Sequence, residues 1–351
     1  MSSAYSASSD LYAKKTGWIP YDDRTQEQKV LTHEFHSRIG IYGAEYLDAE
    51  LPVQAYLPLL ELKHLGKLLF RVFQQSGSCV GAAADRAYKH ATLGDKDRGD
   101  LEELKTLFPF ATYGVGRRKA GMNRPGEGSF GGAQAWAAEH FGVLALDSAL
   151  GLPQPETRYG NWLIWPARTE IQWSHPSSWP IDEARVTEEA NTNQVRTVTQ
   201  VKSRQQLKTG LAQGYGATMA SMFGSRNMRV KGSGDNAILM AEWNTTWPHQ
   251  MGIDGYWINP DVGETYQIAN QWSPSAHPEC PFQSKHGVLG SFSIAAGTMD
   301  RIIAGGEVYL HSNTEGFPTR QLDWSELVWD LPFGPAGHPN QPERDNPEQI
   351  A

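Results

Sequence analysis

The sequence predicts an α+β fold with two lobes and a cleft between them. Helical patterns gather in about residues 70–145, and strand patterns gather in about residues 195–315. Between these halves, residues 150–190 are rich in Pro, Trp and Ser and predict irregular structure. A run of helices followed by a run of strands is typical of α+β proteins. The length of 351 residues suits one large domain or two lobes.

The first half is expected to contain a helix that begins at Cys79. Small residues fill the run GAAADRAYKHA, which favours a helix, and the cluster LGDKDRGD at 93–100 predicts the turn that ends it. The stretch AQAWAAEHFGV predicts a helix that stops at Gly142, because glycine is frequent just past a helix end. Further helices are expected at 101–108 and 111–122, with a Gly-rich loop at 126–132.

The second half is expected to alternate strands with short helices. Residues 247–258 and 265–272 are apolar and aromatic, and NPDVGE between them is a good turn, so the two segments predict a β-hairpin. The other elements expected here are strands at 195–202 and 215–223, a Ser-capped helix at 203–214 and a strand–helix–strand unit at 290–312.

Both ends of the chain are polar. Residues 1–45 predict an N-terminal extension, irregular or loosely attached over its first 30 residues. Residues 331–351 are Pro-rich and predict a disordered tail. The N-terminus lacks the apolar run of a secretory signal peptide, and no stretch reaches the ~18 apolar residues of a membrane span.

Charge and cysteine content narrow the function classes. The net charge of −8 and the pI near 5.8 argue against a nucleic-acid partner, which would need a basic face. The two cysteines lie 201 positions apart and do not predict a disulfide framework. We therefore expect a reduced location, either a cytoplasm or a virion assembled in one.

Cys79 is the first candidate for chemistry. It follows SGS and precedes a small-residue helix, so it stands at or near a helix start, where unpaired N–H groups lower the pKa of a thiol. The alternative is a small buried hydrophobe, which is a common place for a free cysteine. The segment by itself leaves both interpretations open.

A cysteine nucleophile also needs a base and a group that orients the base. The predicted hairpin carries His249 on one strand and Asn270 at the end of the other, and an antiparallel pair can bring these positions side by side. The Asn270 carbonyl would then hold the imidazole in one tautomer. Trp272 would shield this hydrogen bond from water.

Five segments together resemble a papain-like cysteine peptidase, in particular the divergent members from phages and bacteria. In chain order they are QQSGSC, GEGSFGGAQAWAAEHFGV, HQMGIDGYW, YQIANQWS and GSFSIAAGTMDRIIAGGEVYL, which span about residues 70–312. The resemblance implies a papain-like two-lobed domain at 46–330. Its helical lobe at about 70–150 would carry the Cys helix, and its β-rich lobe at about 195–330 would be an antiparallel sheet or barrel. Residues 150–195 would be an insertion between them.

The resemblance also implies roles for the candidate residues. Cys79 would be the nucleophile, His249 the general base and later acid, and Asn270 the residue that orients it. The oxyanion hole would consist of the Cys79 backbone N–H and a glutamine side-chain amide. Gln74 and Gln75 lie five and four residues before the cysteine, whereas the usual family spacing is six, so the choice stays open and Gln74 is favoured.

The Gly-rich loop of the family binds the main chain of an extended substrate, and Gly128 and Ser129 match it here. The sequence departs from the family at Val80, where a bulky aromatic is usual, and at 273–274, where Ser-Pro replaces glycine. A loop at 277–287 is inserted beyond that point.

Two further segments have open roles. The residues before Cys79 lack the family's propeptide pattern and are an inhibitory segment, a docking arm or part of the fold. The insertion carries four tryptophans that would either overhang the cleft or pack inside, and packing is the more frequent role. They are Trp162, Trp165, Trp173 and Trp179.

The predicted function is hydrolysis of peptide or isopeptide bonds through a thioester, which needs no cofactor and no metal. The expected partners are peptide or protein substrates, with virion or scaffold partners through the N-terminal extension. The main alternative is a virion-associated or scaffolding structural protein on the same fold. Asn270 disfavours a transglutaminase-like enzyme, which usually has Asp at that place. A zinc loop at His277, Cys280 and His286 is disfavoured because no second CxxC accompanies it.

Overall fold

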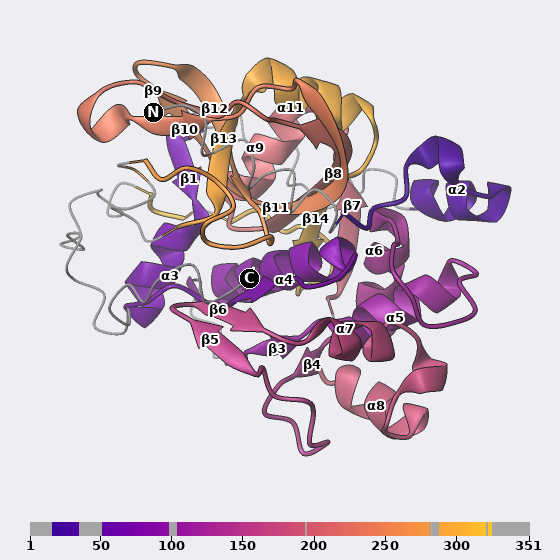
Figure 1. Ribbon diagram of the computed structural model, residues 1–351. Helices are drawn as coiled ribbons and strands as arrows, with labels where there is room; N and C mark the ends of the chain where they lie inside the picture. The colour runs from indigo at the N-terminus through magenta and orange to yellow at the C-terminus, as the bar shows by residue number, and fades with distance from the viewer. Residues whose placement is uncertain are drawn as a thin grey trace.

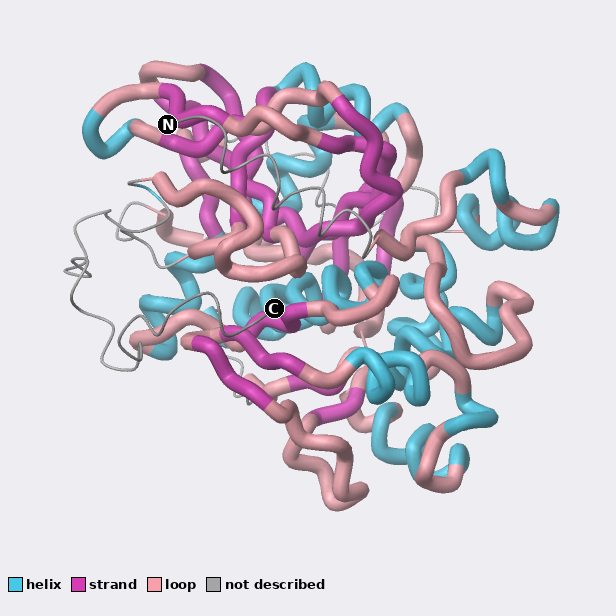
Figure 2. Tube along the Cα trace, viewed as in Figure 1, coloured by secondary structure: helices cyan, strands magenta, loops and turns pink. Residues whose placement is uncertain are grey.

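The computed structural model describes residues 16–34, 51–97, 104–193, 195–280, 282, 288–320 and 322–324. One lobe consists of a large sheet with its helices, and the other consists of helices and short strands. The long helix α4 (Cys79–Asp97) runs between them (Figure 1, Figure 2). The predicted α+β architecture is confirmed. The predicted tail at 331–351 lies outside the described residues.

The large sheet is mostly antiparallel and has the order β7-β14-β8-β11-β12-β13-β10-β9, with β1 added on β11. Apolar side chains of this sheet pack with helices α3, α9 and α11 into one core. The strands are β1 (Gln54–Tyr56), β7 (Thr197–Gln200), β8 (Gly216–Gly224), β9 (Arg229–Lys231), β10 (Ile238–Met240), β11 (Thr245–Asn259), β12 (Gly263–Ala269), β13 (Ser291–Ala295) and β14 (Val308–Ser312); the helices are α3 (Leu57–Leu65), α9 (Arg204–Ala212) and α11 (Ala296–Ala304).

The predicted hairpin is confirmed as β11 and β12. Their antiparallel register runs from Gly252 opposite Ala269 to Asn259 opposite Gly263. Gly263 has φ +89°, which only glycine adopts readily, so the turn requires a glycine at this position. The strand–helix–strand unit β13–α11–β14 is confirmed as well. Strand β11 lies between β8 and β12, so both of its edges are paired within the sheet.

The other lobe combines short helices with two small sheets, one of β2, β6 and β5 and one of β3 and β4. The helix that stops before Gly142 is confirmed, and Gly142 has φ +91°. The elements are α5 (Phe110–Lys119), α6 (Gly131–His140), α7 (Ala167–Trp173), α8 (Glu183–Ala190), β2 (Arg71–Phe73), β3 (Leu107–Phe108), β4 (Leu144–Ala145), β5 (Thr157–Tyr159) and β6 (Trp162–Ile164).

Two predicted boundaries are wrong for one physical reason. The turn predicted from residue 93 is helical through Asp97, and the helix predicted at 101–108 ends as strand β3. Leu93 is fully buried, and Gly94 packs so closely that a Cβ there would lie 2.6 Å from the Gly214 carbonyl oxygen. Tertiary packing therefore outweighs the local turn propensity.

The insertion is ordered rather than irregular, which corrects the prediction for 150–190. Its tryptophans are buried, and Trp165, Trp173 and Trp179 belong to the apolar core of the helical lobe. Trp165 and Trp173 contact Phe108 edge-to-face, with ring centroids 5.9 Å and 4.9 Å away. Trp179 stacks on Trp173 at 5.5 Å. The packing role is thus the one that the structure shows.

Residues 16–34, here called the arm, are packed against the domain, so the predicted loose attachment is wrong for them. The arm contains the 3-10 turn η2 (Tyr21–Asp23) and helix α2 (Gln26–His33), which lies beside α6 (Figure 1). Thr25 and Gln28 form a capping box that fixes the helix start. Trp18 and Leu31 are buried.

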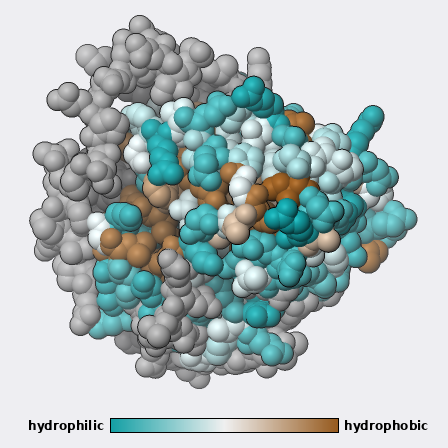
Figure 3. Space-filling model, turned by 90° about the horizontal axis from the view of Figure 1, so that it is seen from below, coloured by the Kyte–Doolittle hydropathy of each residue, from teal (hydrophilic) through white to brown (hydrophobic). Residues whose placement is uncertain are grey.

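The visible surface is largely polar. Seen from below, hydrophilic atoms cover most of the described face, and hydrophobic atoms gather in patches near its middle (Figure 3). The large apolar side chains exposed among the described residues are Val30, Val53, Val230 and Ile258. None of the described helices has the length and apolar character needed to cross a bilayer.

Candidate active site

Cys79 is the first residue of α4. The Ser78 carbonyl accepts hydrogen bonds from the N–H groups of Gly81 and Ala82, which begins the helix one residue later. The helix is lined with alanine and is almost wholly buried, so it approaches the sheet closely. At Gly216 of β8 a Cβ would lie 1.9 Å from the Ala87 carbonyl oxygen, so glycine is required there.

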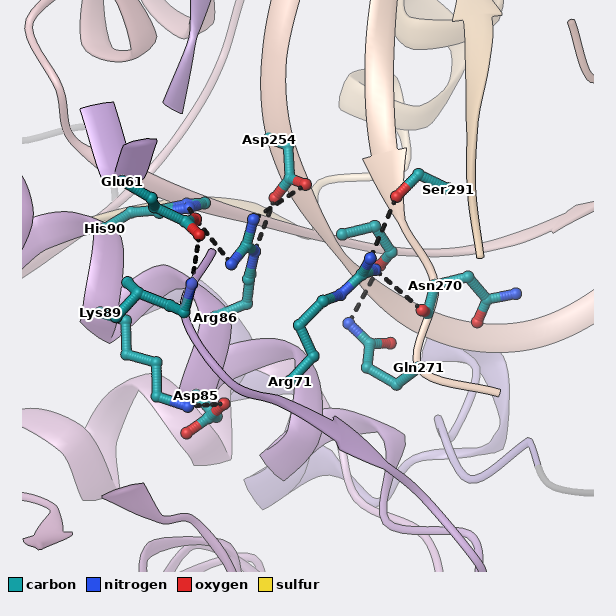
Figure 4. A network of polar contacts seen from close by, with 12 residues as sticks. Glu61, Arg71, Asp85, Arg86, Lys89, His90, Asp254, Asn270, Gln271 and Ser291 are labelled. Atoms are coloured by element: carbon teal, nitrogen blue, oxygen red, sulfur yellow. Dashed lines mark hydrogen bonds and ion pairs between the residues drawn. The ribbon is translucent and has the colours of Figure 1, made fainter. Parts of the chain in front are cut away.

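Buried ion pairs fix α4 against the sheet. Arg86 of α4 donates to Asp254 of β11 at 3.0 Å and pairs with Glu61 of α3 at 2.7 Å (Figure 4). His90 lies 2.8 Å from the same Glu61 carboxylate. Because β11 also carries His249, these pairs set the position of the Cys79 helix relative to the histidine strand.

His249 and Asn270 meet as the hairpin predicts. His249 lies within β11, Asn270 follows the end of β12, and His249 Nε2 is 2.9 Å from Asn270 Oδ1. Trp272 stacks on the imidazole with centroids 4.8 Å apart and is itself buried. Cys79 is within reach of the backbone N–H of Gln250, the residue after His249. His249 and Asn270 are therefore paired, and Cys79 lies next to the strand that carries His249.

Two residues hold Asn270 from its other sides. His277 Nε2 lies 2.8 Å from Asn270 Nδ2. Arg71 donates to the Asn270 carbonyl oxygen at 3.1 Å (Figure 4). An amide offers one acceptor and one donor end, so His277 as acceptor directs Oδ1 toward His249. The proton of His249 is then on Nε2, and Nδ1 bonds no atom of the described residues.

Burial shifts the pKa values of both titrating groups of the candidate pair toward the neutral form. Burial raises the pKa of the Cys79 thiol to about 11, although backbone N–H groups of Gln250 and Gly17 lower it. Burial lowers the pKa of His249 to about 4, and the Asn270 hydrogen bond raises it. The lowered thiol pKa expected at a helix start is thus not found here, because desolvation outweighs the N–H groups.

The loop before Cys79 is held by a buried carboxylate. Glu170 of α7 accepts hydrogen bonds from the backbone N–H groups of Gln75 at 2.7 Å and Ser76 at 3.0 Å. The hydroxyls of Ser76 and Ser78 each donate to it at 2.6 Å. Burial raises the pKa of Glu170, and the Ser76 hydroxyl lowers it. This helix therefore shapes the segment that leads to Cys79.

The two glutamine candidates differ in position. Gln74 is fully buried, its backbone N–H donates to the Gln271 carbonyl at 3.0 Å, and its Nε2 donates to the Ser76 carbonyl at 3.0 Å. Gln75 is half-buried, and its Nε2 donates to the Phe73 carbonyl at 3.3 Å. Of the two glutamines, only Gln74 has a fully buried side chain.

Solved structures resemble this chain over most of its length. Xylellain, a cysteine protease from Xylella fastidiosa, has a TM-score of 0.52 and 16% identity, covering 86% of this chain and 97% of that one. The chain has the papain-like fold. The ragweed pollen cysteine protease Amb a 11 in its proform has a TM-score of 0.51 and 10% identity, covering 87% and 77%. No protein-family model and no curated protein matches the sequence.

In this papain-like fold the Gly-rich loop binds an extended segment, and that segment is the arm. Ile19 N–H donates to the Ser129 carbonyl at 2.8 Å, and Ser129 N–H donates to the Gly17 carbonyl at 2.8 Å. Trp18 N–H donates to the Pro248 carbonyl at 3.3 Å, next to His249. Gly128, with φ +83°, packs against the same arm. The arm thus lies across the region beside Cys79.

The metal interpretation has no support in the described residues. No three His, Cys, Asp or Glu side chains group there to hold an ion, and His286 lies outside the described part of the chain. His277 bonds Asn270 instead, and Cys280 is buried in the large core.

Sequence reasoning missed several residues of the candidate site. Arg71 and Glu170 carry no local signal, and Glu170 lies in the segment expected to be irregular. His277 was considered only as a zinc ligand. The arm was noted only as one of three possibilities for the residues before Cys79. For Arg71, Glu170 and the arm, the role depends on contacts between segments far apart in the chain, and for His277 it depends on the conformation of the loop that follows Asn270.

Proposed function

We propose that this chain is a cysteine peptidase whose arm covers its active site. The observation that carries the proposal is the position of Cys79 at the start of α4, by the backbone N–H of Gln250, next to the His249–Asn270 pair under Trp272. A thiol at a helix start, a neutral imidazole and an oriented amide are the parts needed for acyl transfer.

In the proposed reaction, His249 Nδ1 takes the Cys79 proton, and Sγ attacks the carbonyl carbon of a peptide or isopeptide bond. The oxyanion accepts hydrogen bonds from the Cys79 backbone N–H and a glutamine amide, for which buried Gln74 is favoured. His249 then gives its proton to the leaving amine, and water hydrolyses the thioester. The His249 Nε2–H group stays on Asn270 Oδ1 throughout.

The position of the arm supports a covered resting form. Cys79 and His249 are both fully buried, and the arm supplies part of that cover. Gly17 packs so tightly that a Cβ there would lie 1.7 Å from the Gly77 carbonyl oxygen. A substrate can reach the thiol only after the arm has moved away.

Peptide hydrolysis by a full-length Gly17→Ala variant tests the proposal. The added methyl group cannot fit while the arm is seated, so the variant should hydrolyse a fluorogenic peptide library about tenfold or more faster than the wild type. Cys79→Ala in the same background should abolish the activity. Gly297→Ala is the matched control, because a Cβ there meets no atom within 4 Å. An uncovered chain without Cys79-dependent hydrolysis would instead favour the structural alternative.

A further inference from the structure

A buried carboxylate lies beneath the arm in the same cleft. Glu307 directly precedes β14, and its side chain is 1% exposed. Its backbone carbonyl accepts from Ala220 N–H of β8, which anchors it to the sheet. The Gly131 N–H at the start of α6 donates to Oε2 at 3.0 Å. The carboxylate therefore sits where the two lobes meet.

The arm supplies the other donors to this carboxylate. Trp18 Nε1–H donates to Glu307 Oε2 at 3.0 Å, and the buried Arg24 guanidinium pairs with Oε1. The same guanidinium lies over the Phe130 ring with its carbon 4.3 Å from the centroid. The arm thus provides the Glu307 carboxylate with a hydrogen bond from the Trp18 indole N–H and an ion pair with the Arg24 guanidinium.

The backbone of Trp18 places the Glu307 carboxylate and its surroundings, here called the pocket, beside the candidate active site. Its N–H bonds the Pro248 carbonyl beside His249, and its neighbours on both sides bond Ser129. The Trp18 side chain shares an apolar cluster with Cys79, Phe130 and Ala220. The Trp18 side chain points from this backbone position to Glu307, so a peptide bound with the same backbone contacts would direct one side chain to the same carboxylate.

Departure of the arm changes the balance of charge in this pocket. Of the donors that the described residues place on Glu307, only the Gly131 N–H lies outside the arm. Water can then hydrate the carboxylate, and a substrate side chain that displaces this water leaves a buried carboxylate with one neutral partner, which is costly. A substrate that restores the missing donors gains affinity for the same reason.

We infer that this pocket selects an arginine side chain in the peptide substrate. The inference rests on the proposed function, because it concerns the substrate of that cleft. One arginine can supply what Trp18 and Arg24 supply together: an apolar stem along the pocket and a guanidinium that pairs with Glu307 and stacks on Phe130. A guanidinium suits paired and stacked contacts better than an ammonium does.

Peptide binding tests the inference without requiring catalysis. The full-length Gly17→Ala chain with Cys79→Ala is titrated calorimetrically with acetyl-Ala-Ala-X-Ala-Ala-amide, where X is arginine, citrulline or norleucine. Citrulline keeps the shape of arginine without its charge. The arginine peptide should bind about 10- to 100-fold more tightly than the citrulline peptide. Glu307→Gln should remove that preference, whereas Glu156→Gln, at an exposed carboxylate, should keep it.

Equal binding of the arginine and citrulline peptides, including no detectable binding of either, overturns the inference. A preference that survives Glu307→Gln also overturns it. The proposed function fails separately. If arginine is preferred but the Cys79-containing chain hydrolyses nothing, the arginine selectivity of the pocket is supported and the proposed peptidase function is contradicted. If hydrolysis occurs without that preference, the peptidase stands and the pocket assignment does not.

Discussion

At the scale of single residues, the site depends on the orientation of one amide. Asn270 lies between His249 at 2.9 Å and His277 at 2.8 Å, and the two imidazoles contact opposite ends of its side chain. Burial, and to a smaller extent the nearby His249, lower the pKa of His277 to about 3. His277 therefore stays neutral and can accept from Asn270 Nδ2. It is a positioning residue, because it acts through Asn270.

Replacement of His277 tests this role. In the Gly17→Ala background, His277→Phe removes the acceptor and leaves the Asn270 amide free to rotate, so kcat should fall about tenfold with KM unchanged. His277→Gln keeps an acceptor oxygen and should restore most of the rate. The ¹⁵N shifts of His249 should report the Nε2–H tautomer in the wild type and a tautomer mixture in His277→Phe. Equal kcat values for the Phe and Gln variants would contradict the positioning role.

At the scale of elements, helix α7 holds the loop before the nucleophile. Glu170 accepts from two backbone N–H groups and two hydroxyls of that loop, spanning Gln75 to Ser78. The loop carries the candidate oxyanion donors. Helix α7, which belongs to the insertion, therefore helps to position these donors. An insertion that packs in the core thus also supports the site.

Substitution of Glu170 should affect stability and rate together. Glu170→Ala leaves four donors without their acceptor, so the free energy of unfolding in urea should fall by about 3 kcal/mol or more. The kcat of the Gly17→Ala background should fall as well, because the loop loses its shape. Glu183→Ala, at a half-exposed residue of α8, serves as the control. If the Glu170→Ala variant were as stable as that control, the loop would keep its conformation without the Glu170 carboxylate, which would contradict this role.

Elements with a local signal could be predicted from the sequence, and the others could not. The β11–β12 hairpin could be predicted because apolar and aromatic strand segments flank a clear turn. The end of α6 could be predicted because Gly142, just beyond it, is a glycine that adopts a positive φ. The end of α4 depends on Gly94 packing against Gly214, about 120 residues away. Cys79, His249 and Asn270 could be picked out by type and order. His277 and Glu170 could not, because their contacts arise only when loops close.

At the scale of the whole molecule, the arm and the lobes form one covered site. Burial is the largest cause of both pKa shifts, which leave the Cys79 thiol at about 11 and His249 at about 4. When the arm leaves, this burial decreases, so the thiol pKa should fall and the imidazole pKa should rise. The thiolate–imidazolium pair then becomes populated at neutral and mildly acidic pH.

Alkylation of Cys79 by iodoacetamide between pH 5 and 8 tests the central claim most directly. It is measured by peptide mapping on Gly17→Ala with and without His249→Ala, with Cys280, 3% exposed in the core, as internal reference. Cys79 should label rapidly even at pH 5 to 6, and His249→Ala should slow this labelling about tenfold or more. Labelling that rises only above pH 8 and does not depend on His249 would contradict an assembled catalytic pair.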